Sequence, residues 1–216
     1  MERYVPALSY RRLTRFYDPL LRLTFPDAAV KRTLVEQARI ETGMRVLDVG
    51  CGTGTLVVML ARAQPGADIT GLDGDPEILR LAREKARAAA VGVNLIEGRA
   101  TALPFEDASF DRVTTSLVLH HLTAEDKARS LREMHRVLRP GGELHIADWG
   151  KPHGPLMRAA FLSVQLLDGF ATTQDHAAGR LPQFVSDAGF AGVAELGRWR
   201  TAYGSLSFLR GSKQAR

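Results

Sequence analysis

The chain has 216 residues, 45% of them hydrophobic, which is enough for one domain with a full core. Its net charge is +5, but the basic residues form no long run, which argues against a nucleic-acid-binding tail. No apolar run is long enough to span a bilayer, and the first residues lack the apolar stretch of a secretory signal. The single cysteine, Cys51, excludes an internal disulfide. We therefore expect a cytoplasmic protein without stable membrane insertion.

A glycine-rich turn follows the first predicted strand. Residues 46–49 are aliphatic apart from Asp48, as in a strand covered on both faces. Glycines then stand at alternate positions, Gly50, Gly52 and Gly54, before an apolar segment of helical composition at residues 56–63. Glycine admits positive φ and lets the backbone approach a ligand, so the turn predicts a cradle for a nucleotide-like cofactor at a helix N-terminus.

Two well-known glycine loops fit this turn poorly. The phosphate-binding loop of nucleoside triphosphatases requires a lysine that is missing here. The dinucleotide fingerprint requires a small residue where Thr55 stands, which weakens the nicotinamide interpretation without excluding it. The pattern Asp-x-Gly-x-Gly-x-Gly from Asp48 to Gly54 resembles instead the first motif of the class I S-adenosylmethionine-dependent methyltransferases.

Further segments follow in the order and spacing of that family. Residues 67–73 predict a second strand that ends in Asp73, and Asp75 before Pro76 predicts the N-cap of the next helix. Residues 95–105 and 109–113 resemble the family's adenine-side loop and fourth strand. Residues 133–146 predict an amphipathic helix, a Pro-Gly-Gly break and a fifth strand. The resemblance spans about residues 40–150.

The resemblance implies an α/β fold of three layers. Its centre is a doubly wound, mostly parallel, seven-stranded sheet with an antiparallel last strand. Residues 184–190, followed by Val193, suit the last helix, and residues 203–209 suit an antiparallel hairpin.

The resemblance also implies S-adenosyl-L-methionine as the cofactor. We expect Asp73 to accept hydrogen bonds from the ribose hydroxyls, because one carboxylate accepts two donors. Arg99 departs from the family, which usually carries an acid there; arginine has no acceptor, so it would stack on the adenine or face solvent. The full cofactor-binding set that we expect is Asp48, Gly50, Cys51, Gly52, Gly54, Asp73, Gly74, Arg99, Ala100 and Ser116.

Two additions flank this core, and we expect both to act as helical lids. Residues 1–42 form the first, and Tyr10, Phe16 and Tyr17 in it resemble the N-terminal lid of quinone-biosynthesis and related small-molecule methyltransferases. The second lies at about residues 150–179 within the cofactor-binding domain of residues 43–216, and Phe161 lies on its apolar face. These four aromatic residues are the expected substrate contacts. Ordinary packing against the domain is the alternative for both additions.

The resemblance implies in-line displacement of a methyl group, with a base needed only where the accepting atom carries a proton. His120 and His121 follow the fourth strand, and imidazole titrates near neutrality, so they are the catalytic candidates. The alternative is that they only pack or hydrogen-bond the loop. Adjacent histidines on a regular element would point in different directions, so we predict no metal site.

We therefore expect an S-adenosylmethionine-dependent methyltransferase (EC 2.1.1.-) acting on a small apolar or aromatic molecule, with no nucleic-acid partner. One alternative is an RNA or protein methyltransferase. A second is a protein of this fold that binds the cofactor without transferring a methyl group. A homodimer is one option for the oligomeric state, which the sequence leaves open together with the accepting atom.

Overall fold

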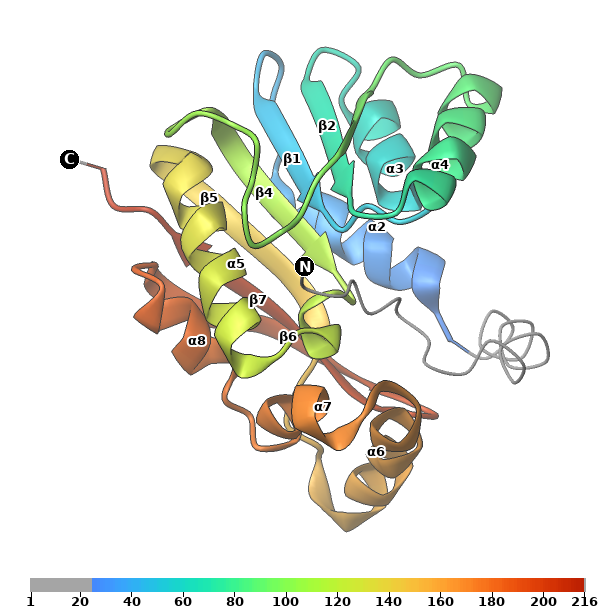
Figure 1. The fold of residues 1–216 in the computed structure, drawn as a ribbon, viewed down its shortest axis with the longest axis vertical. Helices are drawn as coiled ribbons and strands as arrows, with labels where there is room; N and C mark the ends of the chain where they lie inside the picture. The colour runs from blue at the N-terminus through green and yellow to red at the C-terminus, as the bar shows by residue number, and fades with distance from the viewer. Residues whose placement is uncertain (1–24, 216) are drawn as a thin grey trace, which may run out of the picture.

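The computed structural model describes residues 25–215 (Figure 1). Residues 1–24 lie outside this range, and with them the expected contacts Tyr10, Phe16 and Tyr17. The elements in chain order are α2 (Asp27–Ala38), β1 (Arg45–Val49), α3 (Thr55–Ala63), β2 (Asp68–Asp73), α4 (Pro76–Ala88), β3 (Asn94–Glu97), β4 (Phe110–Ser116), the 3-10 helix η1 (Leu119–His121), α5 (Ala124–Val137), β5 (Leu138–Trp149), α6 (Gly154–Asp168), α7 (Phe170–Ala177), α8 (Leu181–Asp187), β6 (Ala191–Thr201) and β7 (Gly204–Ser212).

One seven-stranded sheet, in the order β3-β2-β1-β4-β5-β7-β6, forms the centre of the fold. The pairs from β3 to β5 are all parallel, whereas β7 runs antiparallel to both β5 and β6. The predicted fold class, with its antiparallel last strand and closing hairpin, is confirmed. β1 and the interior strands are long runs of buried residues because helices cover both of their faces.

Helices cover the sheet in two layers (Figure 1). On one face, α2 and α3 pack together, and their side chains join one apolar cluster that also receives α6. On the other face, α5 and α8 pack together over a second cluster that contains Leu131 and Val185. The strand order reverses between β1 and β4, and ligands of open α/β sheets bind at such a switch point, beyond the carboxyl ends of the strands.

Several element boundaries differ from the sequence-based expectation. β4 continues to Ser116, three residues beyond the predicted end. The Pro-Gly-Gly segment forms no separate loop, because β5 begins at Leu138 directly after α5 and absorbs the glycines as an irregularity beside β4. Gly141 has a φ of +83°, which glycine adopts without steric cost. The last helix, α8, ends at Asp187, before Gly189 with its φ of +100°.

The described part of the two additions is helical. α2 contacts α3, β4 and β5, and it buries Val30, Leu34 and Ala38 completely, so residues 27–38 belong to the layer that covers the sheet. The second addition contains two helices, α6 and α7, which lie together at one end of the molecule (Figure 1). No helix within residues 25–215 is both long and apolar enough to cross a membrane.

Candidate functional site

The glycine turn lies between β1 and α3 and is tied to the neighbouring strand. The amides of Gly50 and Cys51 both donate to the carbonyl of Leu72 in β2, at 2.8 and 2.9 Å. Gly50, Gly52 and Gly54 have φ values of +73°, +53° and +75°, a region that L side chains rarely adopt. The alternate glycines therefore serve the backbone path of the turn, as the sequence predicted.

The space around the three glycines differs. A Cβ atom on Gly50 would lie 2.4 Å from a methyl carbon of Val118, and one on Gly54 would lie 2.9 Å from the Cβ of Ala82. A Cβ on Gly52 would meet no atom of the described residues within 4 Å. Gly50 and Gly54 thus allow close packing, whereas Gly52 borders open space that a cofactor can occupy.

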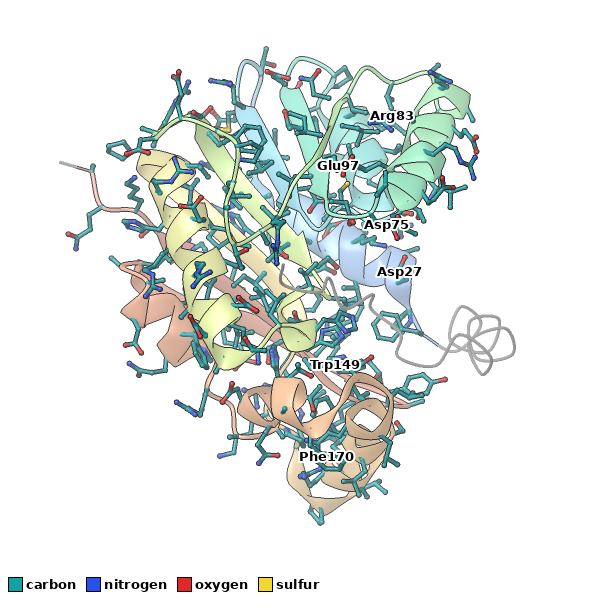
Figure 2. All side chains as sticks on the ribbon, in the orientation of Figure 1. Asp27, Asp75, Arg83, Glu97, Trp149 and Phe170 are labelled. Carbon is teal, nitrogen blue, oxygen red and sulfur yellow. The ribbon has the colours of Figure 1, made fainter. Side chains whose placement is uncertain are left out.

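Asp73 ends β2 and holds the glycine turn. Its carboxylate accepts from the amide of Gly52 at 2.9 Å and from the amide of Asp75 at 3.1 Å. Gly74 is half-buried between the two acids. Asp75 caps α4, as predicted, by accepting from the amides of Glu77 and Ile78. Asp75 follows the carboxyl end of β2, and Glu97 lies at the neighbouring carboxyl end of β3 (Figure 2).

Cys51, the cysteine of the turn, contributes to packing. Cys51 is buried, and its thiol donates to the carbonyl of Gly52. Burial, together with the charges of Asp48 and Asp73, raises the pKa of the Cys51 thiol. The group therefore stays protonated near neutral pH, which suits a wall of the cradle better than a nucleophile.

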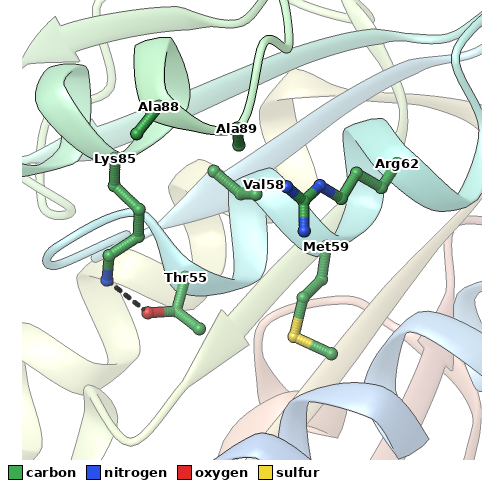
Figure 3. A pocket seen from close by; sticks show the side chains of 7 residues that line it. All are labelled: Thr55, Val58, Met59, Arg62, Lys85, Ala88 and Ala89. Atoms are coloured by element: carbon green, nitrogen blue, oxygen red, sulfur yellow. Dashed lines mark hydrogen bonds between the residues drawn. The ribbon is translucent and has the colours of Figure 1, made fainter.

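Sequence reasoning missed Lys85, which fastens the turn from α4. Its Nζ donates to the hydroxyl of Thr53 at 2.8 Å and to that of Thr55 at 2.6 Å, and Figure 3 shows the second bond. These threonines flank Gly54, so Lys85 links the turn and the start of α3 to α4. The pocket drawn in Figure 3, of about 340 Å³, lies between α3 and α4 and contains none of the expected cofactor-binding residues.

Asp48 lies in β1 below the turn and is buried. Its carboxylate accepts from the hydroxyl of Thr114 in β4 at 2.8 Å. Burial raises the pKa of Asp48 to about 7, against the lowering effects of the Thr114 hydrogen bond and the charge of Lys31, while Asp73 raises it further. Asp48 therefore changes protonation near neutral pH.

Replacing Asp48 by asparagine should remove a pH-dependent penalty on stability. The folded pKa of Asp48, about 7, lies above the ordinary value of 3.8. In the parent, the protonated Asp48 carboxyl therefore makes its full contribution to stability below about pH 4, and this contribution is lost as the pH rises through 7. Relative to the parent, the free energy of unfolding of Asp48→Asn should increase between about pH 4 and pH 8, by up to about 4 kcal/mol. Urea unfolding at both pH values measures this difference.

Asp111→Asn is the matched control because its effect has the opposite sign. Burial alone would raise the pKa of Asp111, but the Arg45 amide and the Arg139 guanidinium outweigh burial and hold it below its usual value. The stabilising contribution of the Asp111 carboxylate is lost only as the pH falls below its ordinary pKa of 3.8, so Asp111→Asn should be less stable than the parent by a similar amount at about pH 4 and about pH 8. A pH-independent difference for Asp48→Asn would show that its carboxyl has an ordinary pKa.

Three of the expected cofactor-binding residues lie near the ends of β3 and β4. Arg99 is exposed, and its carbonyl accepts from the Ala102 amide at 3.0 Å in a turn after β3. Ala100 packs against the core. The Ser116 hydroxyl is buried and finds no hydrogen-bond partner among the described residues. An unpaired buried hydroxyl at the end of β4, together with the open space at Gly52 and the carboxylate of Asp73, fits a polar nucleoside cofactor.

A second cluster begins where β4 passes into η1. Val118 packs against Gly50, so η1 lies next to the glycine turn. Asp148 of β5 is completely buried and accepts from the amides of Leu119 and Trp149 at 2.8 and 2.7 Å. It also lies 2.7 Å from Nδ1 of His120. Asp148 was not among the predicted site residues; an acid next to the last residue of β5 was the available signal.

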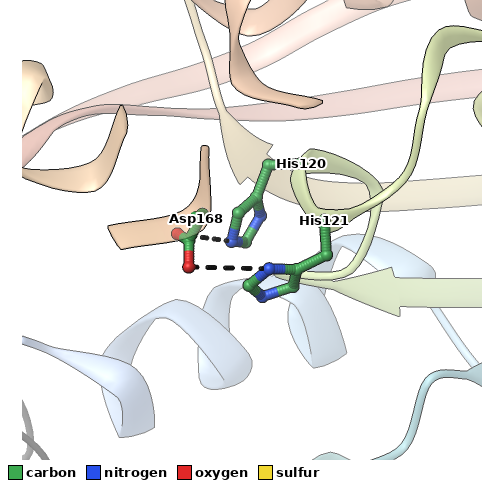
Figure 4. A group of neighbouring side chains, drawn as sticks. All are labelled: His120, His121 and Asp168. Atoms are coloured by element: carbon green, nitrogen blue, oxygen red, sulfur yellow. Dashed lines mark ion pairs between the residues drawn. The ribbon is translucent and has the colours of Figure 1, made fainter. Parts of the chain in front are cut away.

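His121 and Asp168 complete the cluster (Figure 4). The rings of His120 and His121 lie 3.9 Å apart between centroids, and both face the carboxylate of Asp168 at the end of α6, at 3.6 and 3.7 Å. The expectation that adjacent histidines point in different directions is therefore wrong. They lie on a single 3-10 turn, not on a regular strand or α-helix, and an acid 47 residues further along the chain draws both rings together.

The cluster contains both raised and lowered pKa values. Burial would raise the pKa of Asp148, but the charges of His120 and His176 and the hydrogen bond from His120 hold it below its usual range. Burial would lower the pKa of His120, but Asp148 raises it. Burial, and then the charge of His120, lowers the pKa of His121 to about 3, and burial raises that of Asp168.

α7 is anchored beside this cluster by buried polar groups. Nδ1 of His176 lies 2.6 Å from the carbonyl of Trp149. The ammonium of Lys127 in α5 is completely buried, donates to the carbonyl of Thr172 and lies 3.4 Å from Asp175. Buried polar groups that are paired in this way hold the helix in one position relative to η1.

Phe161 has a different place from the one predicted. It is completely buried, and its ring packs against Trp149 at 5.7 Å between centroids. The apolar face of α6 turns toward β7 and the sheet, so Phe161 belongs to the core and does not line an open pocket. For Phe161, the structure thus agrees with the alternative that this addition simply packs against the domain.

Comparisons with known proteins agree with the fold and the glycine turn. Residues 46–142 match the family described as "Methyltransferase domain". The chain is 39% identical over 138 residues to the demethylmenaquinone methyltransferase of Thermus thermophilus, a match that covers 63% of this chain and 62% of that protein. The chain thus spans less than two thirds of the length of this curated relative.

Solved structures share the fold at low sequence identity. The S-adenosylmethionine-dependent methyltransferase SibL matches with a TM-score of 0.71 and 23% identity, covering 94% of this chain and 58% of SibL. The cyclase SpnF matches with a TM-score of 0.70 and 21% identity, covering 87% of this chain and 82% of SpnF. Residues 46–142 therefore match the methyltransferase-domain family, and the chain has the seven-stranded, Rossmann-like fold that SibL and SpnF share.

Proposed function

We propose that the chain is a methyltransferase that transfers a methyl group from S-adenosyl-L-methionine to a small apolar or aromatic molecule. The observation that carries this proposal is the glycine turn, open at Gly52 and bonded to Asp73, at the point where the strand order reverses. S-adenosyl-L-methionine, when bound, supplies an electrophilic methyl group on its sulfonium.

The residues of the cradle would divide the work of binding. Asp73 would accept the ribose hydroxyls, while its bond from the Gly52 amide keeps the turn in position. Ser116 would gain a partner for its buried, unpaired hydroxyl. Arg99 is exposed, so its guanidinium is free to cover the adenine face or to stay in solvent, whereas backbone groups near Ala100 would read the ring edge.

The acceptor is inferred from the relatives. The relative from Thermus thermophilus is named for demethylmenaquinone, which supports an apolar, quinone-like acceptor for this chain. His120 and His121 follow Val118, which packs against Gly50, and are the residues we assign to the acceptor side of the site. Their contribution would be to orient the acceptor and, where its reacting atom carries a proton, to remove it.

We further infer a cytoplasmic enzyme, active as a monomer or homodimer, without a nucleic-acid partner. Its basic residues form no long run of like charge, which supports a small-molecule acceptor over RNA. Phosphate contacts are weakened by salt, so methyl transfer that falls steeply between low and physiological salt would favour a macromolecular acceptor instead.

The first test is calorimetric titration of the purified chain with S-adenosylmethionine, S-adenosylhomocysteine and NADH. We expect both sulfur compounds to bind and NADH not to bind, followed by formation of S-adenosylhomocysteine in equal amounts with methylated product when quinols and related aromatics are supplied. Because the cyclase SpnF shares the fold, the fold alone does not decide the reaction. Binding without any methylated product would favour the cofactor-binding protein that performs no methyl transfer.

A further inference from the structure

The cluster of His120, His121 and Asp168 has the composition of a metal site. One ring nitrogen from each histidine and one carboxylate oxygen all lie within 4.8 Å of one another (Figure 4). Nε2 of His120 lies 3.6 Å from Asp168, and Nδ1 of His121 lies 3.7 Å from the other oxygen of the same carboxylate. Both distances exceed a hydrogen bond, so the three groups converge without hydrogen bonds among them.

The neighbouring acid fixes which nitrogen of His120 faces the cluster. Asp148 already accepts from two backbone amides and lies 2.7 Å from Nδ1 of His120, so that nitrogen is the donor. Nε2 is then directed at Asp168 and His121. A histidine whose second nitrogen donates to a buried carboxylate is the arrangement that orients metal-binding imidazoles.

We propose that His120 Nε2, His121 Nδ1 and the carboxylate of Asp168 bind one divalent first-row metal ion of the Zn²⁺ class. Two imidazoles and one carboxylate are a donor set that such ions favour, and three protein ligands leave one position open. This inference does not depend on methyl transfer, because it rests only on the donor groups and their spacing.

The spacing is close to what coordination requires. Ligand atoms at about 2.1 Å from a tetrahedral ion lie about 3.4 Å apart. The distances of 3.6 and 3.7 Å go to different oxygens of Asp168, and with one ligand atom taken from each residue the three donor atoms lie within 4.8 Å of one another. Rotation of the half-buried His121 ring and of the Asp168 carboxylate would bring the three donor atoms to the spacing of a tetrahedral ion. His121 is 31% exposed and Asp168 15%, so an ion can enter from the side of His121.

A bound ion would connect α6 to η1 and would keep one coordination position open. Asp168 ends α6 in the second addition, whereas both histidines belong to η1 beside the glycine turn. The ion would therefore fasten α6 to the cofactor side of the molecule. Its open position would take water or an oxygen atom of a small molecule. A coordinated nitrogen has no lone pair left for a proton, so this role and the general-base role of His120 and His121 exclude each other.

The test uses Co²⁺ as the probe, because tetrahedral Co²⁺ absorbs visible light and reports its own ligands. The full chain, freed of any affinity tag and treated with a chelator, is titrated with Co²⁺ and then with competing Zn²⁺. We expect visible bands that saturate at one ion per chain and disappear when Zn²⁺ is added. A rise in melting temperature with Zn²⁺ concentration gives an independent reading.

Asp168→Asn and His121→Gln each remove one ligand atom and should weaken Co²⁺ binding at least tenfold. Asp187→Asn on α8 and His135→Gln on α5 remove an equivalent group elsewhere and should bind as the parent does. Circular dichroism confirms that each variant is folded, and the two ligand variants serve as substitutes for each other if one fails to fold. Absence of saturable binding, or equal binding by the ligand variants and the parent, overturns the proposal, while S-adenosylhomocysteine titration reports separately on the proposed function.

Discussion

Replacing Asp73 by alanine should weaken the binding of S-adenosylhomocysteine by about tenfold or more. The carboxylate is positioned at the end of β2, half-buried, and bonded to the Gly52 amide at 2.9 Å. Its loss removes the charged acceptor proposed for the ribose hydroxyls and frees the turn from its anchor. A hydrogen bond to a charged group contributes on the order of 1.5–3 kcal/mol, and about 1.4 kcal/mol corresponds to a factor of ten. Calorimetric titration measures the affinity.

Asp75→Ala is the matched control for Asp73. It deletes a carboxylate two residues away, whose bonds to Glu77 and Ile78 cap α4, so it should lower stability by about 1 kcal/mol. Its backbone amide still donates to Asp73, and the cofactor affinity should stay within about twofold of the parent. The ribose assignment is wrong if Asp73→Ala binds as well as this control.

Replacing Gly52 by alanine should block the cofactor site at modest cost to the fold. The φ of +53° imposes strain of about 1–2 kcal/mol on any L side chain. The new methyl group would meet no described residue within 4 Å, and it would extend into the space assigned to the cofactor. Overfilling a close-packed site costs about 1–3 kcal/mol, so the affinity for S-adenosylhomocysteine should fall by about tenfold or more.

Gly43→Ala is the control that separates backbone strain from obstruction of the cofactor site. Gly43 has a φ of +81°, and its Cβ would also meet no atom of residues 25–215 within 4 Å, but it precedes β1 at the opposite end of that strand. Both variants should lose a similar amount of stability in urea unfolding, and only Gly52→Ala should lose cofactor affinity. Equal affinities in the two variants would place the cofactor elsewhere.

Local patterns in the sequence predicted the glycine turn and the positions of the acids at the end of β2. Alternate glycines after a buried strand, Asp73 at a strand end and Asp75 before Pro76 each act through their immediate neighbours, so their conformations follow from residue type. The mostly parallel sheet with an antiparallel last strand followed from a motif order that spans more than a hundred residues. Boundaries failed where glycines continued a strand, as in β5, because Gly141 and Gly142 exchange backbone hydrogen bonds with Lys213.

The sequence by itself determined the strand, the glycine turn and the acid of the predicted cofactor cradle, because each is encoded within a few consecutive residues. Only the tertiary structure decided the surroundings of His120, because Asp148, Asp168 and His176 reach it from separate elements, 28 to 56 positions along the chain. It also moved Phe161 into the core, since the face that α6 presents depends on its docking against β7. Contacts across such distances depend on how whole helices pack onto the sheet, and no local pattern of residues specifies that.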